Sequence, residues 1–123
     1  MHRQTVDVVI EATQLCLKIY NGRLQGRTAS NTLLLEHLKM LVLNIQPGSG
    51  GGHSLVWHYF IGAADSDLQE QRAFFTDRLV AIYEDTGCAN ISQGLKMLEQ
   101  LWVRPSDQMW PQMLPTIATT LVM

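Results

Sequence analysis

Apolar residues recur every three or four positions along most of this chain, which is the spacing of helices that bury one face. The pattern predicts five helices, over residues 5–20, 30–46, 54–64, 67–86 and 90–104. No stretch that alternates apolar and polar residues is long enough to compete as a strand. We therefore predict an all-α fold, a single irregular bundle of five to six helices that forms one domain over residues 1–123.

The spacing of apolar residues predicts which face of the first helix, residues 5–20, packs against the core. That face consists of Val6, Val9, Ile10, Thr13, Leu17 and Tyr20. The opposite, polar face consists of Glu11, Gln14 and Lys18. Asn21 and Gly22 are expected to end the helix, because both residues tolerate the left-handed backbone of a helix stop.

The most continuously apolar and aromatic stretch is residues 54–66, Ser-Leu-Val-Trp-His-Tyr-Phe-Ile-Gly-Ala-Ala-Asp-Ser. It has almost no polar face, so we predict a central helix that neighbouring helices cover on most sides. The small residues 62–64 would let another helix approach closely. Asp65 and Asp67 are interpreted as caps of the following helix, in preference to a pair of catalytic carboxylates.

Turn residues predict the remaining boundaries. Gly87 is expected to stop the fourth helix, and residues 90–93, Asn-Ile-Ser-Gln, have the residue types of a capping box. Beyond residue 105 the helical spacing continues, but Pro111 and Pro115 cannot donate backbone hydrogen bonds inside a helix. We therefore predict a short, broken sixth helix over residues 106–117.

The composition leaves the state of the surface open. Charged residues make up 16% of the chain, below the roughly 25% typical of soluble domains. Either a partner or more chain covers part of the surface, or the protein is a compact, weakly charged monomer. The net charge of −2 gives no general attraction to phosphate backbones, so we expect no direct nucleic-acid binding. No secretory signal and no membrane span are expected, since no apolar run approaches about 18 residues.

Candidate chemistry is sparse in this sequence. Cys16 and Cys88 are expected to be buried, reduced thiols of an intracellular protein, with a disulfide as the alternative. His53 and His58 are five residues apart, which does not put them on one face of a helix, so we predict no metal site. The glycine-rich residues 48–52 lack the lysine of a phosphate-binding loop, and no nucleophile elbow is present. We predict that the chain is not an enzyme and binds no cofactor.

Aromatic residues are the remaining candidates for a binding site. Two interpretations stay open for them: a pocket between helices for a ligand or a partner, and simple core packing. The candidate pocket residues are Trp57, Tyr59, Phe60, Phe75 and Trp102.

Four stretches together resemble a known family. They are residues 55–64 (Leu-Val-Trp-His-Tyr-Phe-Ile-Gly-Ala-Ala), 72–75 (Arg-Ala-Phe-Phe), 86–91 (Thr-Gly-Cys-Ala-Asn-Ile) and 98–102 (Leu-Glu-Gln-Leu-Trp). In this order they resemble the fungal-specific transcription factor domain, the helical regulatory region of many fungal zinc-cluster transcription factors. The resemblance is strongest over residues 33–110. Many members have proline after the tryptophan, where this chain has His58.

The resemblance implies a nuclear regulator of RNA polymerase II transcription. The six-cysteine zinc cluster of such factors is absent from a chain with two cysteines, so any zinc would belong to a separate DNA-binding module. The partners it implies are proteins or an attached DNA-binding module, and a small apolar effector. The alternative hypothesis is a helical protein–protein interaction module without a transcriptional role, for example one that forms a homodimer through an exposed apolar face.

Overall fold

The computed structural model of the protein describes residues 5–26, 29–45, 55–87 and 89–103. Within these ranges the chain forms helices and no strands, which confirms the predicted all-α class. The helices are α1 (Thr5–Leu24), α2 (Thr32–Val42), α4 (Val56–Asp65), α5 (Gln69–Thr86) and α6 (Ala89–Trp102). The short helix predicted over residues 106–117 and the cap predicted at Ser54 lie outside the described residues.

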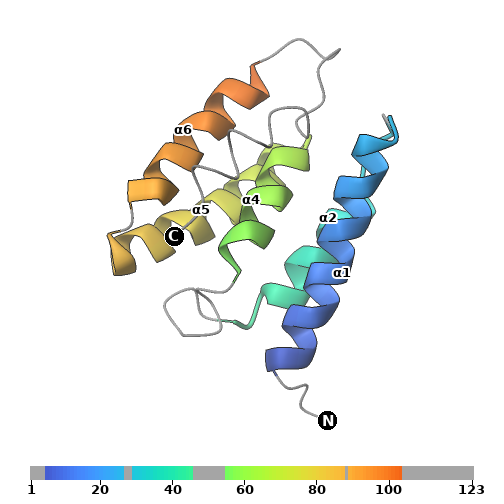
Figure 1. The fold of residues 1–123 in the computed structure, drawn as a ribbon, viewed down its shortest axis with the longest axis horizontal. Helices are drawn as coiled ribbons and strands as arrows, with labels where there is room; N and C mark the ends of the chain where they lie inside the picture. The colour runs from blue at the N-terminus through green and yellow to red at the C-terminus, as the bar shows by residue number, and fades with distance from the viewer. Residues whose placement is uncertain (1–4, 27–28, 46–54, 88, 104–123) are drawn as a thin grey trace.

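Helix α4 is the centre of the bundle, as its composition predicts. It packs against α1, α5 and α6, while α1 also packs against α2, and α2 against α5. In Figure 1, α4 lies between the α1–α2 pair and the α5–α6 pair. Every residue of α4 except Trp57 is buried. Because an apolar helix without a polar face has no side to leave in water, this central position follows from its sequence.

The core face predicted for α1 is wrong in part: Val9 and Tyr20 pack against the core, but three other residues of that face do not. Val6, Ile10 and Leu17 are 67%, 51% and 45% exposed. The buried residues are instead Ala12, Leu15, Cys16 and Ile19, which follow the same helical spacing on the opposite side of the helix. Helix α1 therefore carries two apolar faces, and the face that contains Ala12, Leu15, Cys16 and Ile19 is buried in the bundle, where α1 packs against α2 and α4.

The ends of the helices fit the sequence only in part. Helix α1 continues past Asn21 and Gly22 to Leu24, and the left-handed residue is Gly26, with φ 85°. Gly87 ends α5 as predicted, with φ 66° and its N–H donating to the carbonyl oxygen of Tyr83. Because α6 already begins at Ala89, Asn90 lies inside the helix and is not its N-cap.

The capping role predicted for Asp65 and Asp67 is also wrong. Asp65 is the last residue of α4, and α5 starts only at Gln69, after Leu68 in an extended conformation with no side-chain cap. Asn31 does precede α2 as its N-cap residue, but its side chain makes no capping hydrogen bond. The side chains of Asp65 and Asn31 are used for contacts between helices, described below.

None of the helices in the described part of the chain is both long enough and apolar enough to cross a lipid bilayer.

Candidate functional site

The C-terminal turn of α4, residues 62–65, contacts elements from all parts of the described bundle. Gly62 meets the ring of Phe75 from α5: a methyl group added at Gly62 would lie 2.8 Å from three ring carbons. Phe75 itself is fully buried and meets the ring of Phe74 edge-on at 5.2 Å. Small side chains in this turn were predicted to permit a close helix approach, and the Gly62–Phe75 contact confirms it.

Helix α6 is joined to the same turn by a tryptophan. The indole N–H of Trp102 donates to the carbonyl oxygen of Ala63 at 2.9 Å. The guanidinium of Arg72, from α5, lies 5.0 Å from the centroid of the Trp102 ring, within range of a cation–π interaction. Arg72 also donates through Nε to the carbonyl oxygen of Ser66 at 2.9 Å, so one side chain connects α5 with both α6 and the end of α4.

A buried ion pair connects α1 to the end of α4. Arg23 donates through Nε to Asp65 Oδ1 at 2.6 Å and through Nη2 to Oδ2 at 3.3 Å. The Asp65 side chain is fully buried and that of Arg23 is 8% exposed. Asn31, at the start of α2, donates to the same Oδ2 at 2.9 Å. Losing one partner of such a pair is costly, because the other charge is then left buried without compensation.

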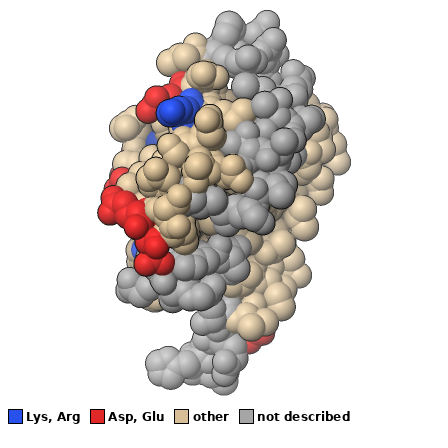
Figure 2. All heavy atoms as spheres, turned by 60° about the vertical axis from the view of Figure 1, so that its left-hand side comes forward, with Lys and Arg blue, Asp and Glu red and all other residues tan. Residues whose placement is uncertain are grey.

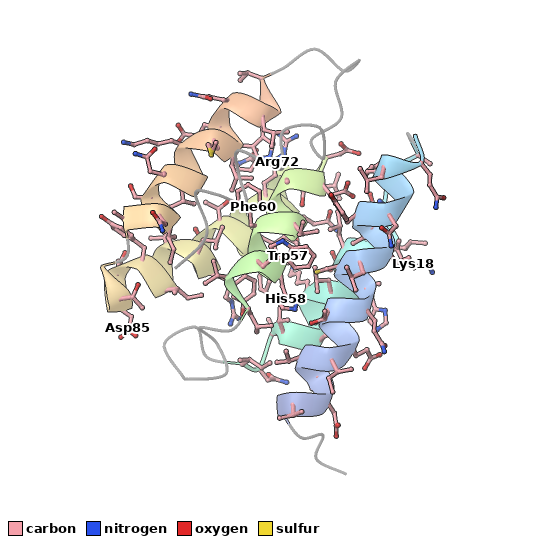
Figure 3. The ribbon with its side chains drawn as sticks, in the orientation of Figure 1. Lys18, Trp57, His58, Phe60, Arg72 and Asp85 are labelled. Carbon is pink, nitrogen blue, oxygen red and sulfur yellow. The ribbon has the colours of Figure 1, made fainter. Side chains whose placement is uncertain are left out.

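His58 makes a second polar contact between α4 and α1. Thr13 Oγ1 donates its one hydrogen to the carbonyl oxygen of Val9 at 2.8 Å, so His58 Nε2 carries the hydrogen in its 2.6 Å contact with Thr13. The other ring nitrogen, Nδ1, is buried without a hydrogen-bond partner. Burial lowers the pKa of His58, and the imidazole is therefore held neutral. Figure 3 shows His58 between α4 and α1, with Lys18 on the far side of α1.

The five predicted pocket residues divide into two groups. Tyr59, Phe60 and Phe75 have no exposed surface and are part of the central core. Trp57 and Trp102 are partly buried and pack against that core, so they alone among the five reach the surface. The ligand pocket stays a prediction, and these two tryptophans are the places where an effector or partner could touch the described core from outside.

The described residues offer little to catalysis. Burial raises the pKa of the Cys16 thiol to about 12, so it is protonated and unreactive at neutral pH. Burial also raises the pKa of Tyr59, against an opposing effect of the nearby Arg78 charge. No group of three or more His, Cys, Asp or Glu side chains in the described ranges is arranged to hold a metal ion. The polar contacts at α4 connect helices to one another.

Sequence reasoning missed the contacts that Arg23 and Asn31 each make with Asp65. Arg23 precedes Asp65 by 42 residues, and hydrophobic spacing says nothing about pairs at that distance. The available signal was indirect: a charged residue at the end of an otherwise apolar helix requires a partner if it is buried.

A family model described as "Fungal specific transcription factor domain" matches residues 3–114. Neither the curated proteins nor the solved structures contain a match to the chain.

Proposed function

The chain belongs to the fungal specific transcription factor domain family, and from this premise we propose that it regulates transcription as a helical module that does not itself contact DNA. The observation that carries the proposal is the family match over residues 3–114, which spans every described helix. Domains of this family have a regulatory role in transcription and are not a class of enzymes. We further propose that the protein acts in the nucleus.

The contacts of the arginine side chains support a module that does not contact DNA. All three arginines of the described ranges bind groups of this chain: Arg23 binds Asp65, Arg72 contacts Ser66 and Trp102, and Arg78 donates to the carbonyl oxygens of Leu43 and Ile45. DNA binding needs such groups at the surface.

The described surface is, in addition, acidic along α5. Exposed acidic residues repeat every seven positions along this helix, at Glu70, Asp77 and Glu84, followed by Asp85. Figure 2 shows acidic side chains gathered in a patch on the face it draws, where basic side chains are few. A surface of this sign repels the phosphate backbone.

Regulation is proposed to act through the position of α4. A partner or a small apolar effector that contacts Trp57 or Trp102 would favour one packing of α4 over another. Because the turn at residues 62–65 contacts α1, α5, α6 and the start of α2, a shift of this turn would change the whole bundle. An attached or associated DNA-binding module could then respond to that change.

A reporter assay tests the proposal. Residues 1–123 are fused to a heterologous DNA-binding domain in a fungal cell, and reporter output is compared with that of the DNA-binding domain alone at equal protein level. A second fusion carries Phe60→Asp, which places a charge in the core and unfolds the bundle. We expect the native fusion to change reporter output and the Phe60→Asp fusion to lose that effect. Equal output from all three proteins would contradict the proposal.

The alternative, an interaction module without a transcriptional role, is favoured by one observation, the exposed apolar residues of α1. In the same assay it predicts a protein that binds a partner but leaves the reporter unchanged.

A further inference from the structure

The described helices form two groups. Helix α1 packs more extensively against α2 than against α4, and α5 packs more extensively against α4 and α6 than against α2. We call α1 and α2 the N-terminal pair, and α4, α5 and α6 the C-terminal trio. Figure 1 shows the pair on one side of α4, with α5 and α6 on the other. The two groups meet where α1 packs against α4 and where α2 packs against α5.

Two polar contacts connect α1 to α4 across this boundary. The Arg23–Asp65 ion pair is buried, and the attraction between two buried charges is largely offset by their loss of water. His58 Nε2 lies 2.6 Å from Thr13 Oγ1, but Nδ1 of the same ring is buried without a hydrogen-bond partner among the described residues. Because such an atom is unfavourable only while water cannot reach it, separation of α1 from α4 would remove this penalty.

Polar side chains also connect α2 to α5. Gln71 is 1% exposed, and its Nε2 donates to Glu36 Oε2 at 2.9 Å and to the carbonyl oxygen of Thr32 at 3.1 Å. Its Oε1, in contrast, is buried and accepts no hydrogen bond from the described part of the chain. Arg78 donates to two carbonyl oxygens at the end of α2. Both halves of the boundary therefore combine polar contacts with a buried polar atom that has no partner.

Close apolar packing holds the C-terminal trio together. Phe75 of α5 packs directly on Gly62 of α4, and Leu79, Ile91 and Leu98 from α5 and α6 are no more than 1% exposed. Burial of apolar surface is favourable by itself, whereas a hydrogen bond between protein groups gains only its difference from the bonds with water that it replaces. The boundary between the two groups is thus the weaker of the two kinds of contact.

We propose that the N-terminal pair opens as one unit while the C-terminal trio stays folded, and that this opening gives the domain its second state. Most of the stability of a helix in a protein comes from packing, so α1 and α2 lose their helical structure together when they leave the trio. The apolar side chains that the pair buries, Ile19 and Leu38 among them, keep the closed state the more populated one. Opening uncovers His58 and Asp65 on α4 and Gln71 on α5, where an effector or partner could then bind.

The inference deepens the proposed function, on which it rests only for the regulatory role of the open state. Native-state hydrogen exchange of the complete chain, followed at single amides by NMR, tests the opening itself. Amides in α1 and α2 should share one free energy of opening. They should be protected at least about 10-fold less than the slowest amides of the trio.

Two variants distinguish this opening from unfolding of the whole bundle. Ile91→Val, in the core of α6, weakens packing that is present in both the closed and the open state. It should lower the protection of the slowest trio amides about 5-fold and leave that of α1 and α2 unchanged. Thr13→Val removes a contact between the two groups and leaves a buried donor on His58. Protection should then fall about 10-fold in α1, in α2 and in the trio alike.

Equal protection in all the helices would overturn the inference, because it describes a single cooperative unit. So would an Ile91→Val variant that loses as much protection in α1 and α2 as in the trio, or a parent in which α6 opens before the N-terminal pair. The reporter assay fails separately: a pair that opens in a chain without effect on the reporter supports the opening and contradicts the proposed function.

Discussion

Replacing Gly62 by alanine tests how closely α4 and α5 approach each other. The added methyl carbon would lie 2.8 Å from Cδ1, Cδ2 and Cε1 of Phe75. Contacts this short are not tolerated, and the ring has no exposed side towards which it could turn. One of the two helices would have to move.

Two opposing effects set the magnitude. In a helix interior, alanine is normally more stable than glycine by about 1 kcal/mol. Overpacking of a well-filled core costs about 1–3 kcal/mol, and the simultaneous contact with three carbons of a fixed ring places Gly62→Ala at the upper end. We therefore expect the free energy of unfolding to fall by about 2 kcal/mol, which lowers Tm by roughly 8 °C for a domain of this size.

Urea unfolding followed by circular dichroism measures the change, and two variants separate the causes. Ala73→Gly, at an exposed position of α5, measures the propensity effect alone and should lose about 1 kcal/mol. Phe75→Leu makes room for the new methyl group, so the double variant should lose at least about 1 kcal/mol less than the sum of the single losses. If Gly62→Ala is as stable as the parent or more stable, the close approach of the two helices is refuted.

Three further predictions concern buried polar groups. Asp65→Ala should lower the free energy of unfolding by about 3–5 kcal/mol, because it leaves the charge of Arg23 buried without its partner. The double variant Arg23→Met/Asp65→Leu removes both charges, so urea titration should show a smaller loss for it. Burial lowers the pKa of His58 in the folded protein, so below pH 6.5 the unfolded chain binds more protons than the folded one. Between pH 7 and 5.5 the free energy of unfolding of the parent should therefore fall by about 1 kcal/mol more than that of His58→Gln. An equal dependence of stability on pH in both proteins would contradict this. Burial raises the pKa of Cys16 to about 12. In a variant with Cys88 changed to serine, Cys16 should therefore react with a thiol reagent at pH 8 only as fast as the protein unfolds, and not at the rate of a free cysteine.

The existence of the helices and the central place of α4 could be predicted from the sequence because both depend on local patterns. Spacing of apolar residues identifies a helix, and the lack of any polar face identifies a buried one. Gly87 was a reliable stop since only a residue without a side chain adopts a left-handed backbone at no cost. Gly22, by contrast, stays helical and buried in α1.

The orientation of α1 could not be predicted because the helix has apolar residues on two sides. Ile10 and Leu17 are as large as the buried Leu15 and Ile19 and larger than Ala12 and Cys16, so apolar bulk does not identify the buried face.

The role of Asp65 was missed for a different reason. A carboxylate just before a predicted helix is usually its cap, and the sequence offers no sign that this side chain would instead bind an arginine 42 residues earlier.

The last turn of α4 contacts each of the other helices. Asp65 binds α1 and the residue before α2, the carbonyl oxygen of Ala63 accepts a hydrogen bond from α6, and Gly62 lets α5 pack closely. Since one turn of four residues sets the positions of these elements, a regulatory contact need not be large to act. A ligand or partner that moves this turn would break a buried ion pair on one side and a close ring contact on the other, and both favour a single position of α4. In the function proposed above, such a contact would favour a second packing of the bundle, because a close-packed core resists gradual deformation.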